Sequence, residues 1–195
     1  MHLLPITVEF LDAYPEIALR LVLTDRVVNT VEENIDISIR IGALPDSSMI
    51  ATRIGSVRLV HCASPAYLAA RGRPADPADL QDHDCICVDN LVAPRTWKFT
   101  KGAREIVAPI RSRLVVSDSE AAIDAAIAGA GAGITRVMSY KMETAKRSGA
   151  LEIMLEEFEL EPLPLHIVYA ERNPMPLKLR VFLDWVIPRL KARLS

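Results

Sequence analysis

The sequence predicts an α/β fold in which buried strands alternate with helices, and two segments carry this prediction. Residues 35–42, IDISIRIG, form an apolar run that stops at a basic residue and a glycine, as expected where a buried strand ends. Residues 59–68, LVHCASPAYL, predict a strand that breaks at Ser64-Pro65 and restarts as a helix. Open α/β sheets bind ligands at such strand ends, so a site is expected near these loops.

The N-terminal part of the chain predicts a strand–helix–strand unit behind an apolar helix. Residues 3–13 carry enough apolar side chains for one helix face. Residues 17–23 alternate as a strand, residues 26–34 suit a short helix, and residues 35–41 are typical of a buried strand. This order implies parallel strands joined by a right-handed crossover.

The rest of the chain continues the alternation of strands and helices. Pro65 suits the first turn of a helix, and Ser117 and Glu120 have the spacing of a capping box at the start of another. The proline-marked segment 161–165 suggests that the chain returns there to its first lobe. Strands are expected at 53–61, 85–89, 96–100, 104–109, 113–116, 133–137, 151–155 and 166–170, and helices at 66–70, 117–128, 140–147 and 177–194.

Charge and cysteine content argue against several classes of protein. The 195 residues include 23 basic and 25 acidic side chains, a formal net charge of −2. A free-standing nucleic-acid binder usually has a basic excess, which is absent here. Three cysteines form no extracellular framework, no secretory leader opens the chain, and no apolar stretch suits a membrane span. We therefore expect a protein of the reducing cytoplasm that does not contact membranes.

Nearly the whole chain resembles the effector-binding domain of LysR-type transcriptional regulators. The matching segments are HLLPITVEFLDAYPEI, DRVVNTVEENIDISIRIGALPDSSMIATRIG, ASPAYLAARGRPADPADLQDHDCI and SDSEAAIDAAIAGAGAGITRVMSY. The resemblance implies a two-lobed, periplasmic-binding-protein-like (type 2) fold. Each lobe would be a Rossmann-like sheet with flanking helices, joined to the other by two crossover strands. Residues 1–61 and 167–195 would form the first lobe, and residues 62–166 the second.

The resemblance also implies a function as a sensor of small molecules. A metabolite, either a carboxylate or an aromatic compound, would bind between the lobes of a homodimer or tetramer whose subunits meet through helices 3–13 and 119–128. DNA would be reached only through an N-terminal winged helix-turn-helix domain that is missing from this sequence. The first strand of the first lobe, which ordinarily precedes residue 3, is missing too, so we expect a fragment of a longer protein.

Two other classes share this kind of fold. A solute-binding protein that feeds a transporter is the main alternative, and the lack of an export signal argues against it. An enzyme on a similar scaffold is the third possibility. The sequence contains no G-x-S-x-G elbow, no Walker A loop and no H-E-x-x-H motif, so we expect no catalytic residues and no cofactor.

Residues 117–119 form the first candidate ligand contact. Ser117, Asp118 and Ser119 precede a predicted helix, whose N-terminal N–H groups and positive dipole end can hold an anion. Asp118 argues against a bare anionic ligand unless its side chain points away. The alternative is that Ser117 only caps the helix.

Thr135 and Arg136 are the second candidate, because they interrupt a strand that should be buried. A charged side chain there is costly unless it is paired or faces a cleft. Arg136 could hold a carboxylate through two hydrogen bonds. The alternative is an internal salt bridge to Asp118, Glu120 or Asp124.

Three further residues end strands that face the supposed cleft. Arg40 and Gly42 close the strand 35–41, and Arg40 could contact a ligand, remain solvated, or pair with Asp36 or Asp46. Ser64 offers a hydroxyl and an N–H group to a ligand, or it caps the helix that begins at Pro65.

The segment HDCIC, residues 83–87, is the one that suggests a metal. Structural zinc sites usually have four ligands with two to four residues between paired cysteines. Here Cys85 and Cys87 are one residue apart, which puts both on the same side of a strand, and no second cluster completes the set. We therefore expect no metal site and assign these thiols to packing rather than to a redox switch.

Overall fold

The structure, a computed structural model, describes residues 3–25, 28, 32–44, 49–88, 95–128, 133–171 and 174–194. The chain divides into two compact units, Met1–Val57 with Leu163–Ser195, and Arg58–Pro162. These boundaries lie four residues before the ones expected from the sequence at both crossings. At the first crossing, the strand starting at Leu59 already belongs to the sheet of the second unit. At the other crossing, the strand starting at Leu163 already belongs to the sheet of the first unit.

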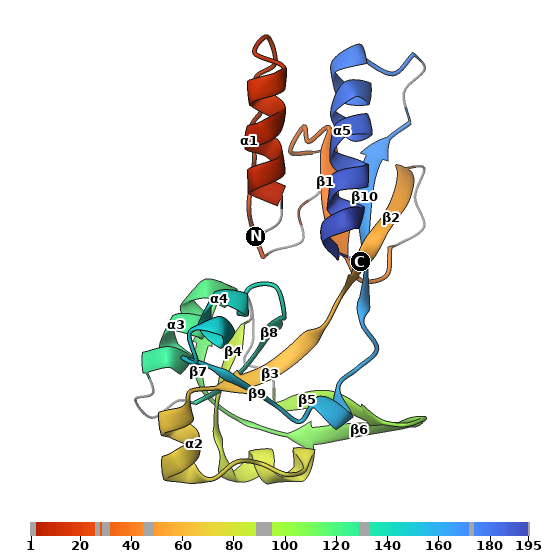
Figure 1. Cartoon of the computed structure of the whole chain (residues 1–195). Helices are drawn as coiled ribbons and strands as arrows, with labels where there is room; N and C mark the ends of the chain where they lie inside the picture. Colours follow the sequence, from red (N-terminus) through yellow and green to blue (C-terminus); the bar gives the residue numbers. More distant parts are fainter. Residues whose placement is uncertain are drawn as a thin grey trace. The chain divides into compact units, whose positions relative to one another are not determined.

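The first unit is a small antiparallel sheet covered by two helices (Figure 1). Its strands are β1 (Ile37–Ile41), β10 (Leu163–Ala170) and β2 (Met49–Val57), in the order β1-β10-β2. Helices α1 (Leu3–Ala13) and α5 (Leu177–Leu194) have the bounds predicted from the sequence. They share an apolar core with the sheet. Beside it, Phe10 of α1 packs edge-on against Phe182 of α5.

The predicted strand at residues 17–23 is wrong, and with it the parallel strand–helix–strand unit. These residues form no strand, and Leu21 and Leu23 are 38% and 53% exposed. A strand needs a neighbour for its backbone groups, and among the described residues β1 pairs only with β10. Most of the helix predicted at 26–34 lies outside the described residues.

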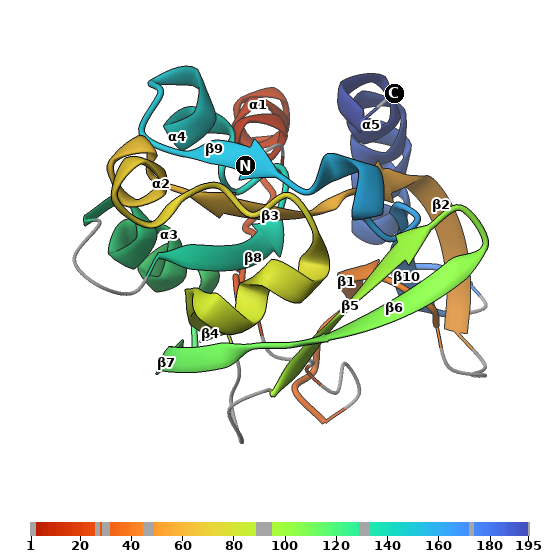
Figure 2. The same cartoon turned by 90° about the horizontal axis from the view of Figure 1, so that it is seen from below.

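The second unit is built on a five-stranded mixed sheet. Its order is β7 (Arg111–Val116), β4 (Asp84–Val88), β8 (Ile134–Met138), β3 (Leu59–Ala63) and β9 (Glu152–Met154), and Figure 2 shows these strands side by side. Strand β4 is parallel to β7 and β8, whereas β3 runs antiparallel to β8 and β9. The single strand predicted at 53–61 is therefore divided at Arg58 between two sheets.

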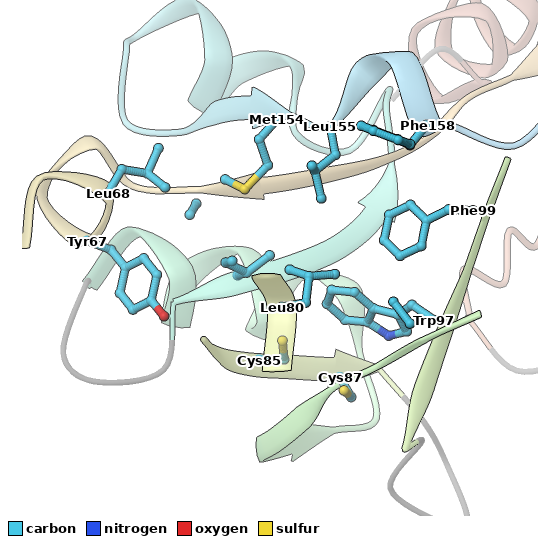
Figure 3. Close-up of a cluster of buried hydrophobic side chains, with 13 residues drawn as sticks. Tyr67, Leu68, Leu80, Cys85, Cys87, Trp97, Phe99, Met154, Leu155 and Phe158 are labelled. Carbon is cyan, nitrogen blue, oxygen red and sulfur yellow. The ribbon is translucent and has the colours of Figure 1, made fainter. Parts of the chain in front are cut away.

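Successive side chains of these strands point to opposite faces, and each face has its own core. Helix α3 (Ser119–Ala128) covers one face, where Val60, Ile86 and Val137 are buried. The hairpin of β5 (Thr96–Lys101) and β6 (Arg104–Pro109) belongs to the other core, drawn in Figure 3. The remaining elements of this unit are α2 (Pro65–Arg71), α4 (Glu143–Arg147) and the 3₁₀ helices η1 (Pro77–Asp82) and η2 (Glu156–Phe158).

No helix in the described part of the chain is both long enough and apolar enough to span a membrane.

Candidate functional site

Two polar side chains of the second unit lie opposite each other in the middle of its sheet. The antiparallel ladder of β3 and β8 pairs His61 directly with Arg136. Both side chains point to the face that carries the β5–β6 hairpin. This follows from the alternation along each strand, since Ala63 and Ile134, two residues away, belong to the core on that face.

His61 is buried among aromatic rings and makes no hydrogen bond. Its side chain is 2% exposed, and its ring stacks on Phe99 at 4.5 Å between centroids and lies 5.3 Å from Trp97. Neither ring nitrogen has a partner in the described part of the chain. Burial, and then the charge of Arg136, lower the pKa of His61 to about 3, so the ring is neutral near pH 7. Each unsatisfied buried group costs about 1–3 kcal/mol.

Arg136 lies over an aromatic ring rather than beside a carboxylate. Its guanidinium carbon is 5.3 Å from the centroid of Trp97, and burial lowers its pKa. Among the described residues no acidic side chain forms an ion pair with it. The predicted partners Asp118, Glu120 and Asp124 are exposed at the start of α3 or on it. This helix covers the opposite face of the sheet, so the salt-bridge alternative is wrong.

Thr135 points away from Arg136, although the two are neighbours in the sequence. It is fully buried, and its hydroxyl donates to the carbonyl oxygen of Ile86 at 3.2 Å. The two side chains lie on opposite faces of the sheet, so a small ligand on the Arg136 face does not reach the Thr135 hydroxyl.

The 117–119 segment follows the carboxyl end of β7, and its capping residue is not the one predicted. Asp118 Oδ2 accepts from the N–H of Ala121 at 3.2 Å, and the Asp118 carbonyl accepts from Ala122 at 3.2 Å. Helix α3 therefore begins at Ser119 with Asp118 as its N-cap, and the predicted capping box of Ser117 and Glu120 is wrong. Contact of this segment with a ligand stays a prediction.

Ser64 lies at the opposite end of the sheet from this segment. It directly follows β3, which runs antiparallel to β8 and thereby also to β4 and β7. Five residues of strand separate the two ends by roughly 15 Å at about 3.3 Å per residue. The Ser64 hydroxyl accepts from the N–H of Tyr67 at 3.3 Å and caps α2, so one small metabolite cannot bridge Ser64 and Ser117.

Arg40 and Gly42 belong to the first unit. Arg40 donates from Nη2 to the carbonyl oxygen of Val28 at 2.5 Å and from Nε to Ser38 at 3.4 Å. The predicted partner Asp46 lies outside the described residues. Gly42 has a φ of +96° and donates to the Pro164 carbonyl at 2.8 Å, so this turn needs a glycine. Ligand contact of Arg40 and Gly42 stays a prediction.

The cysteines of the HDCIC segment are packing residues. Cys85 and Cys87 are buried in the core on the hairpin face, and neither forms a disulfide (Figure 3). Burial raises the pKa of Cys85 to about 12, which makes a thiolate unfavourable there. Among the described residues no three His, Cys, Asp or Glu side chains are placed to hold a metal ion.

In a second charged cluster, Asp84 is paired with arginines. The Asp84 side chain is 1% exposed and lies 2.6 Å from Arg111 Nη2, 3.0 Å from Arg113 Nη1 and 3.8 Å from Arg71 Nη2. A register shift between Cys85 and Ile86 makes Arg113 an extra residue of β7, which lets both arginines of this strand reach Asp84. Burial opposes ionisation of Asp84, but Arg113 and Arg111 lower its pKa.

The sequence pointed to Arg136 but missed His61 and Trp97. A histidine in the apolar strand LVHCA was itself a signal, because a buried polar ring needs a partner. The pairing of His61 with Arg136, however, depends on the register of β3 and β8, which only the structure gives.

The comparisons with known proteins identify the family. The sequence model of the LysR substrate binding domain matches residues 1–191. The HTH-type transcriptional regulator YhjC of Escherichia coli K12 is 33% identical over 195 residues, which are 99% of this chain and 64% of YhjC. The activator AaeR of the same organism is 31% identical, over 92% of this chain and 57% of AaeR. The chain thus spans less than two thirds of these relatives.

Solved structures agree with this result. The regulatory domain of CrgA from Neisseria meningitidis has a TM-score of 0.82 at 30% identity, covering all of this chain and 93% of that one. The regulatory domain of AphB from Vibrio vulnificus has a TM-score of 0.76 at 28% identity, covering 94% and 89%. The chain belongs to the LysR substrate-binding domain family, and the predicted periplasmic-binding-protein-like α/β fold is confirmed. Because the relatives are transcriptional regulators, the solute-binding alternative is not supported.

Proposed function

We propose that this domain senses a small carboxylate and that Arg136 holds the carboxylate group. The observation that carries the proposal is that Arg136 is largely desolvated yet pairs with no carboxylate of the described residues. A guanidinium in such a setting is stabilised by an anion that forms two hydrogen bonds with it. The Trp97 ring beside it makes the surroundings of the guanidinium apolar, which suits a planar or aromatic ligand.

The ligand changes the function of the domain only if it binds one conformation more tightly than another. In this proposal the bound state controls transcription through an N-terminal DNA-binding part of the whole protein. Arg40, Gly42 and either Ser64 or the 117–119 segment remain proposed contacts of the effector site. They are weaker candidates than Arg136, because each already has a structural role or hydrogen bond within the chain.

A thermal-shift screen tests the proposal, using benzoate, phenylacetate, succinate and 2-oxoglutarate as probes. A ligand at 100 times its Kd adds about 2.7 kcal/mol, which raises the Tm by roughly 5–11 °C for a chain of this size. Arg136→Gln should abolish the shift, whereas Arg104→Gln, an exposed arginine of β6 in the same unit, should retain it. A shift that persists in Arg136→Gln, or no shift with any carboxylate, contradicts the proposal.

We further propose that two copies associate through α1 of one and α3 of the other. Leu4 and Val8, one helical turn apart on α1, are 48% and 51% exposed, and Ile127 on α3 is 40% exposed. Reciprocal contacts of this kind give a closed two-fold dimer, from which a tetramer can be built. Apolar side chains at these positions gain from burial in such an interface.

Sedimentation velocity tests the assembly. Val8→Arg and Ile127→Arg should each shift the distribution toward monomer, because a charge replaces a buried apolar contact. Val107→Arg is the matched control, since Val107 is 54% exposed on the β5–β6 hairpin and belongs to neither helix. An unchanged distribution in both test variants contradicts this interface.

The remaining parts of the proposal concern partners and place of action. The domain has a formal net charge of −2 and would not bind DNA by itself, so no binding is expected in fluorescence anisotropy with labelled duplex DNA. A regulator of this family would act in the cytoplasm, where the DNA is. It would bind its effector without converting it, and mass spectrometry should recover the ligand unchanged after long incubation.

A further inference from the structure

The β5–β6 hairpin covers two polar groups that have different chemistry. Arg136 offers only hydrogen-bond donors and a positive charge. His61 beside it is neutral, so one ring nitrogen donates and the other accepts. The rings of Trp97 and Phe99, which supply no acceptor, lie against His61.

A histidine used only to fill this space would be an unusual choice. Phenylalanine would pack equally well between two aromatic rings and would leave no nitrogen unpartnered. Both nitrogens of His61 lack a partner in the described part of the chain, and the side chain is 2% exposed. Across the β3–β8 ladder, His61 lies opposite Arg136, the residue proposed to hold the ligand.

We propose that His61 is a specificity-determining residue that hydrogen-bonds a hydroxyl or amino group of the ligand. The inference rests on the proposed function and narrows the ligand class to planar carboxylates that carry a second polar group. The carboxylate lies on Arg136, and the second group reaches a nitrogen of His61 from the same face of the sheet. Because Trp97 and Phe99 cover His61, Trp97 turns away when the ligand binds.

The hairpin is built in a way that permits this movement. Strands β5 and β6 form a two-stranded sheet of their own and share no ladder with the five-stranded sheet among the described residues. One anchor at the far end of β5 is Thr100, whose hydroxyl donates to the Glu159 carbonyl at 2.7 Å. Trp97 lies three residues from this anchor, toward the start of the strand.

The test compares benzoate with the three monohydroxybenzoates, by titration calorimetry on the wild-type chain and on two variants. At least one hydroxybenzoate should bind roughly 2- to 10-fold more tightly than benzoate, as one added hydrogen bond allows. In His61→Phe this preference should vanish while benzoate affinity is retained. His166→Phe is the matched control, since His166 of the first unit also has an unpaired buried nitrogen and should leave the preference intact.

Each outcome separates this inference from the proposed function. If all four acids bind with equal affinity and Arg136→Gln abolishes their binding, the role of His61 is overturned and Arg136 remains the anion site. A preference that survives in His61→Phe overturns it as well. Binding of none of the acids overturns both statements. If His61→Phe does not fold, the imidazole ¹⁵N resonances of wild-type His61 decide: a shift with hydroxybenzoate but not with benzoate supports the inference, and unchanged resonances overturn it.

Discussion

Removing the charge of Asp84 should lower stability at neutral pH but not in acid. Asp84→Asn keeps the side-chain shape and removes the negative charge that faces Arg111 and Arg113 at 2.6 and 3.0 Å. Each arginine is more than half exposed, so each contact is worth about 1 kcal/mol rather than the value for a buried pair. We therefore expect a loss of about 2 kcal/mol at pH 7, or roughly 4–8 °C in Tm.

The pH dependence identifies the cause of that loss. The folded-state pKa of Asp84 is lower than its unfolded value, so its contribution is present above about pH 4 and is lost as the pH falls through the folded pKa. Urea unfolding at pH 7 and at pH 3 should show the wild type and Asp84→Asn converging in acid. Asp124→Asn, an exposed carboxylate of α3, is the control and should show little change at either pH. An equal loss at both pH values would mean that packing, not charge, is responsible.

Three further substitutions probe the second unit. Arg58→Gln should lower the free energy of unfolding in urea by about 1–2 kcal/mol, because Arg58 binds both carboxylate oxygens of Glu159, which is 9% exposed. A decrease no larger than that in Arg104→Gln would contradict this. Gly133→Ala should destabilise the chain by about 1–3 kcal/mol, because the added Cβ would overlap the buried Tyr67 ring. Tyr67→Leu should relieve this loss, so the double variant should lose less stability than the two single variants together. If the two losses simply add, the clash is refuted. Ser64→Ala should cost about 1 kcal/mol through loss of its cap without changing carboxylate affinity, and a fall in affinity would instead make Ser64 a ligand contact.

The pattern of neighbouring residues in the sequence was enough to predict the bounds of some helices and strands. Helices α1 and α5 and strand β6 have the predicted bounds, because apolar periodicity and turn residues mark them. Residues 17–23 carry an equally good strand pattern but form none, because a strand also depends on a neighbour that the pattern does not reveal. The division of the predicted strand 53–61 at Arg58 has the same cause, since its two halves pair in different sheets.

The candidate site shows the same limit at the level of single residues. Strand alternation by itself separates Thr135 from Arg136, because neighbours in a strand point to opposite faces. Sequence could not place Ser64 and Ser117 at opposite ends of one sheet, because that depends on β3 running antiparallel to β8. It could not pair His61 with Arg136 for the same reason.

The contrast between Arg136 and two other charged residues of the second unit, Asp84 and Arg58, supports a ligand role for Arg136. Asp84 has two arginines within 3.0 Å, and Arg58 is held by Glu159 and Glu156. At both positions the chain provides an opposite charge. At Arg136 the described residues provide an indole ring and a neutral histidine instead. The second unit provides counter-charges for Asp84 and Arg58, but its described residues provide no anion for the Arg136 guanidinium. This difference fits a site whose anion comes from outside the chain.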